Sequence, residues 1–105
     1  MIDRQLVESI TSVYVKHGWE LRRVLLCEPA TSPVEGVEVV QGKIDGLWFS
    51  RERNDGDTAW ELRHISAAPF ALVAVVTEGT DDVETALADV ENRMAETLAK
   101  QHRGH

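Results

Sequence analysis

The sequence predicts a single α+β domain over residues 1–105. We expect a two-layer sandwich with an N-terminal helix, an antiparallel sheet of about four strands arranged as a meander, and a C-terminal helix. Two observations lead to this prediction. Apolar residues recur every three or four positions near both ends of the chain, whereas the middle alternates or forms short apolar runs between turn residues. A chain of 105 residues has room for one hydrophobic core, so we expect no second domain.

The first helix is expected over residues 3–17. The side chains of its core-facing stripe recur at intervals of three and four, and they are Ile2, Leu6, Ile10, Val13 and His17. Gly18 follows directly and is the expected C-cap, because glycine adopts the left-handed conformation at little cost. We therefore expect the chain to turn at this glycine.

A first strand and a long loop are expected next. Residues 19–27 are rich in apolar side chains that suit a strand, namely Leu21, Val24, Leu25 and Leu26. Residues 28–42 contain two prolines and two glycines, so we expect an irregular loop with a short strand at residues 37–40. Loops of this length are frequently functional.

The centre of the chain is predicted to form a β-hairpin from residues 44–51 and 58–65. Its turn is Asn54-Asp55-Gly56-Asp57, since these residue types tolerate positive φ. We expect an even-length loop, which gathers Leu47, Phe49, Trp60 and Leu62 on one face. The other face then holds Trp48, Ser50, Glu61 and Arg63. An odd-length loop mixes the two sets and costs core burial.

The last strand and the last helix complete the predicted fold. Residues 70–77 are apolar on both faces, which is typical of a central strand that is covered on both sides. The final helix is expected from Asp81 onwards, with an apolar stripe of Val83, Leu87, Val90, Met94 and Leu98. We expect both helices to cover the face that carries Leu47 and Phe49. One helix on each face is the alternative.

Composition bears on which partners and cellular locations to expect. The formal net charge is −7, and a surface of that charge is repelled by phosphate backbones, so we expect no nucleic-acid partner. Cys27 is the only cysteine, which excludes an internal disulfide and fits a reducing, cytoplasmic location. The longest apolar run, residues 70–76, is too short to cross a membrane as a helix, so we expect no membrane partner.

No residue pattern marks a catalytic, metal or cofactor site. Glu61 and His64 lie three residues apart on a predicted strand, which sends their side chains to opposite faces. His102 and His105 have a helical ligand spacing but lie at the end of the given chain. Cys27 lacks the setting of a nucleophile. We therefore expect no metal or cofactor, and the balance of these observations is against an enzyme.

The predicted binding surface is the face with Trp48, Ser50, Glu61 and Arg63, together with the neighbouring Arg51. Tryptophan and arginine dominate protein interfaces, and the predicted sheet has more apolar surface than two helices cover on one face. We expect an acidic interaction domain that forms a homodimer through this face, with a chaperone-like or adaptor-like role and a protein partner. The alternative is a solvated sheet face that is stabilised by cross-strand pairs and binds no partner.

A second function class remains open on the same residues. A small-molecule site, or a minor enzyme, would lie between the sheet and the loop of residues 28–42. Its polar groups would be Arg51, Glu61, Arg63 and His64. Arg63 would bind a carboxylate, and Glu61 would act as a base.

Overall fold

The computed structural model describes residues 4–28, 36–53, 56–66, 70–77 and 82–103. Two helices flank the strands in sequence. In chain order the elements are α1 (Arg4–Lys16), β1 (Glu20–Leu26), β2 (Glu38–Gln41), β3 (Gly46–Glu52), β4 (Asp57–His64), β5 (Ala71–Thr77) and α2 (Val83–Arg103). Within these ranges neither helix combines the length and the apolar content that a bilayer crossing requires.

The strands form one open sheet in the order β2-β1-β3-β4-β5. β1 and β2 run parallel, and the other neighbours are antiparallel. The predicted α+β sandwich is confirmed, with five strands instead of about four. The additional strand is β2, at the position where the sequence predicted a short strand. The rest of the segment predicted as a loop includes residues 29–35, which lie outside the described residues.

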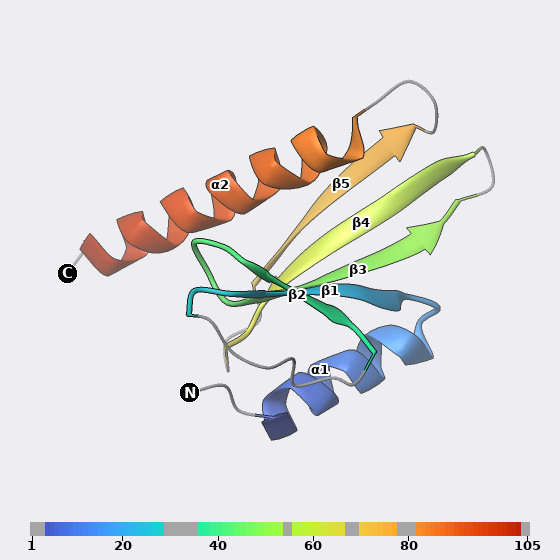
Figure 1. Cartoon of the computed structure of the whole chain (residues 1–105), viewed down its shortest axis with the longest axis horizontal. Coiled ribbons are helices and arrows are strands. Elements are labelled where there is room, and N and C mark those ends of the chain that lie inside the picture. Colours follow the sequence, from blue (N-terminus) through green and yellow to red (C-terminus); the bar gives the residue numbers. More distant parts are fainter. Residues whose placement is uncertain (1–3, 29–35, 54–55, 67–69, 78–81, 104–105) are drawn as a thin grey trace.

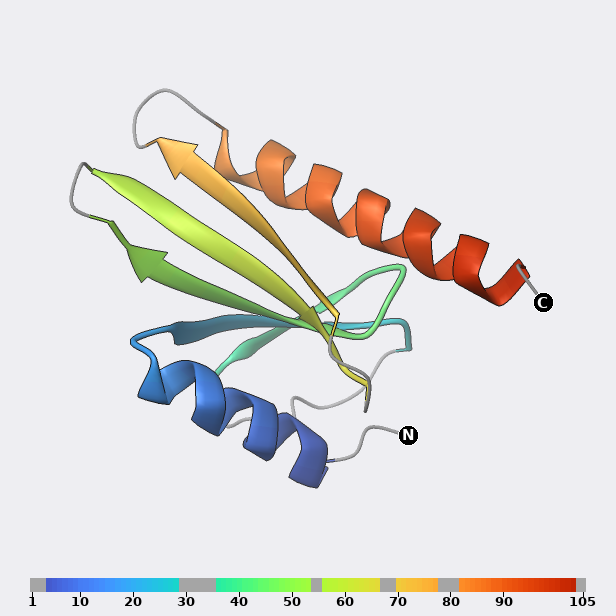
Figure 2. The same ribbon diagram turned by 180° about the vertical axis from the view of Figure 1, so that it is seen from behind.

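The two helices lie on opposite faces of the sheet (Figures 1 and 2). The prediction that both cover one face is therefore wrong, and the alternative of one helix per face is correct. The core beside α1 is formed by Val7, Ile10, Val24, Leu26, Leu47 and Phe49. The core beside α2 is formed by Leu25, Ile44, Trp48, Leu62, Leu87, Val90 and Met94. Neighbouring positions on the central strands are buried on both sides, so each face needs a cover.

The β3–β4 register also differs from the predicted one. Phe49 pairs with Glu61 and Trp48 pairs with Leu62, so the hairpin has the odd-length loop. Gly56 takes a φ of 79° in that loop, and the backbone N–H of Arg53 donates to the carbonyl of Asp57 at 2.9 Å. The odd register costs no burial here, because α2 covers the face that the prediction left open.

The turn after α1 positions one end of the sheet. Gly18 has a φ of 88°, and its N–H donates to the carbonyl of Val15. The N–H of Trp19 donates to the carbonyl of Tyr14 at 3.0 Å. This pair of bonds is the Schellman motif, in which a glycine ends the helix as the sequence predicted. Trp19 is thereby placed next to Tyr14, with ring centroids 6.1 Å apart.

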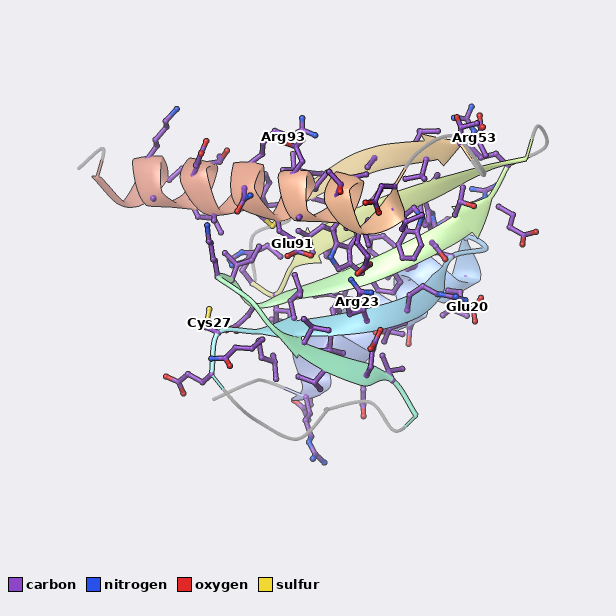
Figure 3. The ribbon with its side chains drawn as sticks, turned by 45° about the horizontal axis from the view of Figure 1, so that its top comes forward. Glu20, Arg23, Cys27, Arg53, Glu91 and Arg93 are labelled. Atoms are coloured by element: carbon purple, nitrogen blue, oxygen red, sulfur yellow. The ribbon has the colours of Figure 1, made fainter. Side chains whose placement is uncertain are left out.

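α2 is held to the sheet by a charged contact as well as by its apolar stripe. Arg23 on β1 bonds Glu38 on β2 at 3.3 Å and Glu84 on α2 at 3.1 Å (Figure 3). At the start of the helix, the side chain of Asp82 accepts the N–H of Glu84 at 3.1 Å and the hydroxyl of Thr85 at 2.8 Å. Asp82 is therefore the N-cap of a helix that begins at Val83, and Asp81, the expected start, lies outside the described residues.

Candidate functional site

The residues predicted to form one binding surface lie on two different faces of the sheet. Trp48 and Ser50 face α2. Arg51, Glu61 and Arg63 face the α1 side, because the odd register shifts the alternation of β4 by one residue. The predicted Trp48–Arg63 surface is therefore not formed.

Trp48 is a core residue. Its side chain is fully buried, and its ring packs edge-on against Trp60 with centroids 6.2 Å apart. The indole Nε1 donates to Oε2 of Glu91 at 2.8 Å, so the one polar atom of the ring has a partner. Ser50, on the same strand, is also buried. Trp48 therefore offers no open surface, whereas Ser50 borders a hollow that is also lined by Glu20, Arg51 and Trp60.

Tyr14 brings Glu61 into contact with α1. Its ring stacks on Phe49 with centroids 4.0 Å apart, and its hydroxyl donates a hydrogen bond to a carboxylate oxygen of Glu61. Burial raises the pKa of Tyr14, and the adjacent Glu61 raises it further, because both disfavour a phenolate. Sequence reasoning missed Tyr14, whose residue type and spacing gave no sign of this partner.

Arg63 is buried beside the same cluster. Its guanidinium donates to the backbone carbonyl of His64 and, at 3.4 Å, to that of Ser66. These bonds fix the chain where it leaves β4. Arg63 therefore acts chiefly as a structural group in the described part of the chain, and its donors do not point to an open site.

The open part of the sheet lies beside these residues, on the α1 side of β4 and β5. α1 packs chiefly on β1 and reaches β4 through Tyr14, while Val73 and Val75 of β5 stay exposed on this side. Val73 and Val75 are 52% and 47% exposed. With Ala59 and Ala71 they form an apolar surface that we call the open strip. The surplus apolar area predicted from the sequence is present on the second face of β5, but Trp48 is buried and does not belong to it.

One end of the open strip is hollowed. The hollow has a volume of about 460 Å³ and is lined by Trp19, Arg51, Glu52, Arg53, Ala59, Val73 and Val75. Arg51, Ala59 and Val75 form one row across β3, β4 and β5. The two arginines are exposed, and neither makes an ion pair with another described residue. Among the predicted site residues, Arg51 lines this hollow, and both Arg51 and Ser50 line a neighbouring hollow beside Trp60.

The outer edge of β5 is also open, since no strand in the described part of the chain pairs with its second side. The N–H of His64 donates to the carbonyl of Phe70, which marks that residue pair as hydrogen-bonded. Hydrogen-bonded pairs alternate with non-bonded ones along an antiparallel ladder. The backbone groups of Ala71, Val73 and Val75 therefore point away from β4, toward the free edge.

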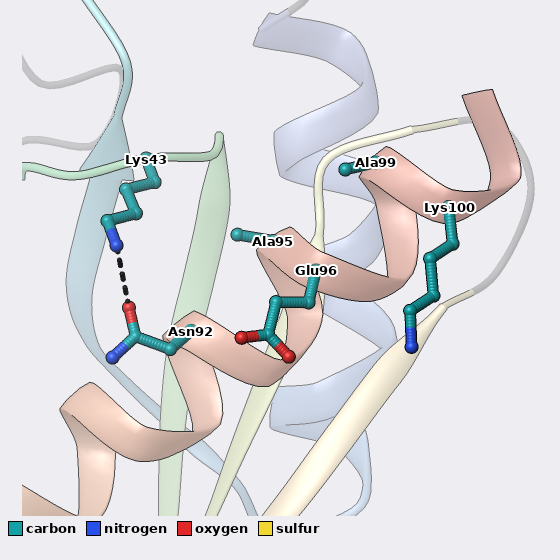
Figure 4. A pocket seen from close by; sticks show the side chains of 6 residues that line it. All are labelled: Lys43, Asn92, Ala95, Glu96, Ala99 and Lys100. Atoms are coloured by element: carbon teal, nitrogen blue, oxygen red, sulfur yellow. Dashed lines mark hydrogen bonds between the residues drawn. The ribbon is translucent and has the colours of Figure 1, made fainter. Parts of the chain in front are cut away.

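A second hollow lies along the C-terminal half of α2, with a volume of about 490 Å³ (Figure 4). Its lining consists of Lys43, Asn92, Ala95, Glu96, Ala99 and Lys100. Lys43 Nζ donates to Oδ1 of Asn92 at 3.1 Å across it. The lining charges are mixed, and the two alanines supply only a small apolar floor. This hollow therefore offers less to a ligand than the one at Arg51.

The small-molecule site predicted between the sheet and residues 28–42 is not assembled by the described residues. β2, the strand within that segment, is separated from β4 by β1 and β3. His64 faces α2, whereas Glu61 and Arg63 face the α1 side. Burial lowers the pKa of His64, whose Nδ1 lies 3.1 Å from Oγ of Ser66. No cluster of three or more potential metal ligands exists among the residues described.

Comparison with protein-family models, curated proteins and solved structures finds no match to this chain. Function must therefore be argued from the open strip, the free edge of β5 and the hollow at Arg51.

Proposed function

We propose that this protein is a non-enzymatic interaction domain that acts as a homodimer, with a second copy paired to the free edge of β5. The single observation that carries the proposal is the chemistry of that edge. β5 has the sequence Ala-Leu-Val-Ala-Val-Val-Thr, without a charge, a proline or a bulge. Natural edge strands usually carry one of these devices, because an unprotected edge pairs with other chains.

The open strip supports the same proposal. In an antiparallel β5–β5 pair the exposed valines of one copy lie beside those of the other. Cross-strand pairs of β-branched residues contribute about 0.2–1 kcal/mol each. The backbone groups of Ala71, Val73 and Val75 also gain partners in this arrangement. A symmetric pair uses the same surface on both copies, as most soluble homodimers do.

The charges next to β5 are compatible with a second copy. The chain has a net charge of −7, which disfavours self-association over much of its surface. On α2, however, Asp89 and Arg93 form an ion pair at 3.1 Å. Figure 3 shows Arg93 on the side of α2 opposite Glu91, which points toward the sheet. In a symmetric dimer with antiparallel β5 strands, Asp89 of one copy could therefore face Arg93 of the other.

A chaperone-like or adaptor-like role is the more specific form of this proposal. In that case an extended segment of a different protein takes the place of the second copy along β5. Strand addition of this kind draws affinity from main-chain hydrogen bonds and specificity from alternate side chains. The two forms differ in what occupies the edge, so one experiment separates them.

The test compares Val75→Pro with Val75→Thr by native mass spectrometry over a range of protein concentrations. Proline removes an outward N–H and leaves the β4–β5 hydrogen bonds intact, whereas threonine keeps the N–H and a β-branched shape. We expect a dimer for the parent chain and for Val75→Thr, and a monomer for Val75→Pro. Circular dichroism checks that both variants fold, and Val73→Pro replaces Val75→Pro if the latter does not.

Amide hydrogen exchange locates the interface independently. The amides of Ala71, Val73 and Val75 are expected to exchange more slowly at concentrations where the dimer forms. Those of Leu72 and Ala74, which point toward β4, are protected at all concentrations. A chain that stays monomeric at high concentration contradicts the homodimer. The adaptor form is then supported if a synthetic β-strand peptide slows exchange at the amides of Ala71, Val73 and Val75.

A further inference from the structure

The hollow at the end of the open strip combines an apolar floor with cationic walls. Ala59, Val73 and Val75 form the floor, and Trp19 contributes an aromatic side chain. The position of Trp19 is fixed by the Schellman turn of α1 and by its edge contact with Tyr14. A volume of about 460 Å³ lies within the range of roughly 300–1,000 Å³ that small-molecule sites occupy.

The charge of the hollow is opposite to that of the chain. Arg51 and Arg53 line it, and neither forms an ion pair with a described residue, while Glu52 is the one acidic side chain in the lining. A local excess of positive charge on a chain of net charge −7 favours an anionic occupant at this place. An anion could bind these arginines without breaking an ion pair between described residues.

Arg51 lies at the wall of this hollow, which it shares with a neighbouring hollow beside Gly18 and Trp60. A Cβ built at Gly18 would lie 3.8 Å from Nε of Arg51, so this side chain extends over the turn that precedes Trp19. On the sheet, Arg51, Ala59 and Val75 are register neighbours across β3, β4 and β5, and all three line the hollow. A ligand whose charged group binds Arg51 can therefore place an apolar tail over Ala59 and Val75.

We infer that this hollow binds an organic carboxylate with an apolar tail of aryl or alkyl type. The carboxylate accepts two parallel hydrogen bonds from Arg51, the geometry in which arginine binds carboxylates most strongly. The tail covers Ala59 and Val75, and an aryl group packs against Trp19. The site lies on the face of the sheet and not at its edge, so the inference does not depend on dimerisation through β5.

The test uses 4-phenylbutyrate and its neutral counterpart 4-phenyl-1-butanol as probes. Both are titrated into isotope-labelled protein, and amide chemical shifts are followed by NMR. We expect saturable shifts at Trp19, Ala59, Val73 and Val75 for the carboxylate, and binding at least tenfold weaker for the alcohol. Replacing Arg51→Gln is expected to weaken carboxylate binding at least tenfold.

Two further variants separate the role of Arg51 from a general effect of charge. Arg4→Gln removes a positive charge at the far end of α1 and is expected to leave the affinity unchanged. Arg51→Lys keeps the charge but removes the planar fork, so its affinity should fall between those of the parent chain and Arg51→Gln. Equal binding of acid and alcohol, an unchanged affinity in Arg51→Gln, or shifts confined to Lys43 and Ala95 would each overturn the inference.

Discussion

The indole nitrogen of Trp48 and the carboxylate of Glu91 are joined by a hydrogen bond of 2.8 Å. Trp48 lies on the central strand β3, and Glu91 lies in the middle of α2. The bond is a buried polar contact within the largely apolar layer between the sheet and α2. It satisfies a donor that the protein buries completely.

Substitution of Glu91 tests the value of this bond. Glu91→Leu leaves the indole N–H buried without an acceptor, so we expect the free energy of unfolding to fall by about 1–3 kcal/mol. Glu91→Gln keeps an acceptor and should cost less. Urea denaturation measures both, with Glu96→Leu as the control on the exposed side of α2. A loss as small in Glu91→Leu as in the control would contradict the assignment.

Tyr14 provides a spectroscopic probe, because it is the only tyrosine in the chain. Its pKa is raised by burial and then by Glu61, so the folded state holds the phenolic proton more tightly than the unfolded state does. This contribution to stability is present below the ordinary tyrosine pKa of about 10 and is lost as the pH rises above it. Tyrosinate absorbance should therefore appear together with alkaline unfolding.

The variant Glu61→Gln sharpens that experiment. Removal of the charge lowers the pKa of Tyr14 toward its ordinary value, although burial, the larger cause, still holds it up. Ultraviolet titration and circular dichroism on the same samples separate ionisation from unfolding. A native protein that ionises Tyr14 in the ordinary range, before any unfolding, would disprove the buried contact with Glu61.

His64 predicts a pH dependence of the opposite sense. Burial lowers its pKa, and nearby Arg63 lowers it further, while Asp45 partly offsets both. The unfolded state therefore binds the proton more readily, and stability should decrease as the pH falls below the ordinary histidine pKa of about 6.5. Denaturation of His64→Gln should show a flatter pH dependence in this range than the parent chain. Replacement of the exposed His17 by glutamine is the control.

Cys27 is expected to react slowly with alkylating reagents, although its side chain is exposed. Partial desolvation raises the pKa of the Cys27 thiol, and the carboxylate of Asp45 raises it further. Less of the reactive thiolate is therefore present at neutral pH. Asp45→Asn keeps an acceptor for the backbone N–H of Cys27, which donates to Oδ1 of Asp45 at 2.9 Å. This variant should react faster.

The single cysteine makes the measurement direct. Mass spectrometry after timed exposure to iodoacetamide gives the alkylation rate of Cys27 at each pH. Glu28→Gln is the comparison, and its effect should be weaker because Glu28 contributes least to the raised pKa of Cys27. An alkylation rate in Asp45→Asn equal to that of the parent chain would argue against the electrostatic influence of Asp45.

Local pattern and turn chemistry were sufficient to predict the elements of this fold. α1 and its glycine cap follow from apolar spacing and from Gly18, and the existence of β5 follows from its continuous apolar run. The prediction that β5 is a central strand covered on both faces is wrong, because it lies at an edge of the sheet with Val73 and Val75 exposed. The hairpin register was wrong because it depends on the backbone path of the turn, including the positive φ of Gly56. A shift of one residue there moved Glu61 and Arg63 to the other face.

The candidate site was harder to predict than the elements, since it depends on which face each helix covers. Trp48 has the residue type of an interface anchor, yet α2 buries it. Tyr14 and Glu61 are 47 residues apart, and no spacing rule relates them. Arg51 was a predicted site residue, but its open position beside Trp19 follows from the turn of α1 and the row across β3, β4 and β5.

The two edges of the sheet differ in length, in strand direction and in polarity. β2 is short, runs parallel to β1, and carries the exposed polar residues Glu38 and Gln41. Such an edge is a poor template for another strand. If β5 is the only adhesive edge, its use in a symmetric pair consumes it, and growth into a fibre stops at two chains. The short, polar β2 edge would thus prevent polymerisation of a protein that dimerises through β5.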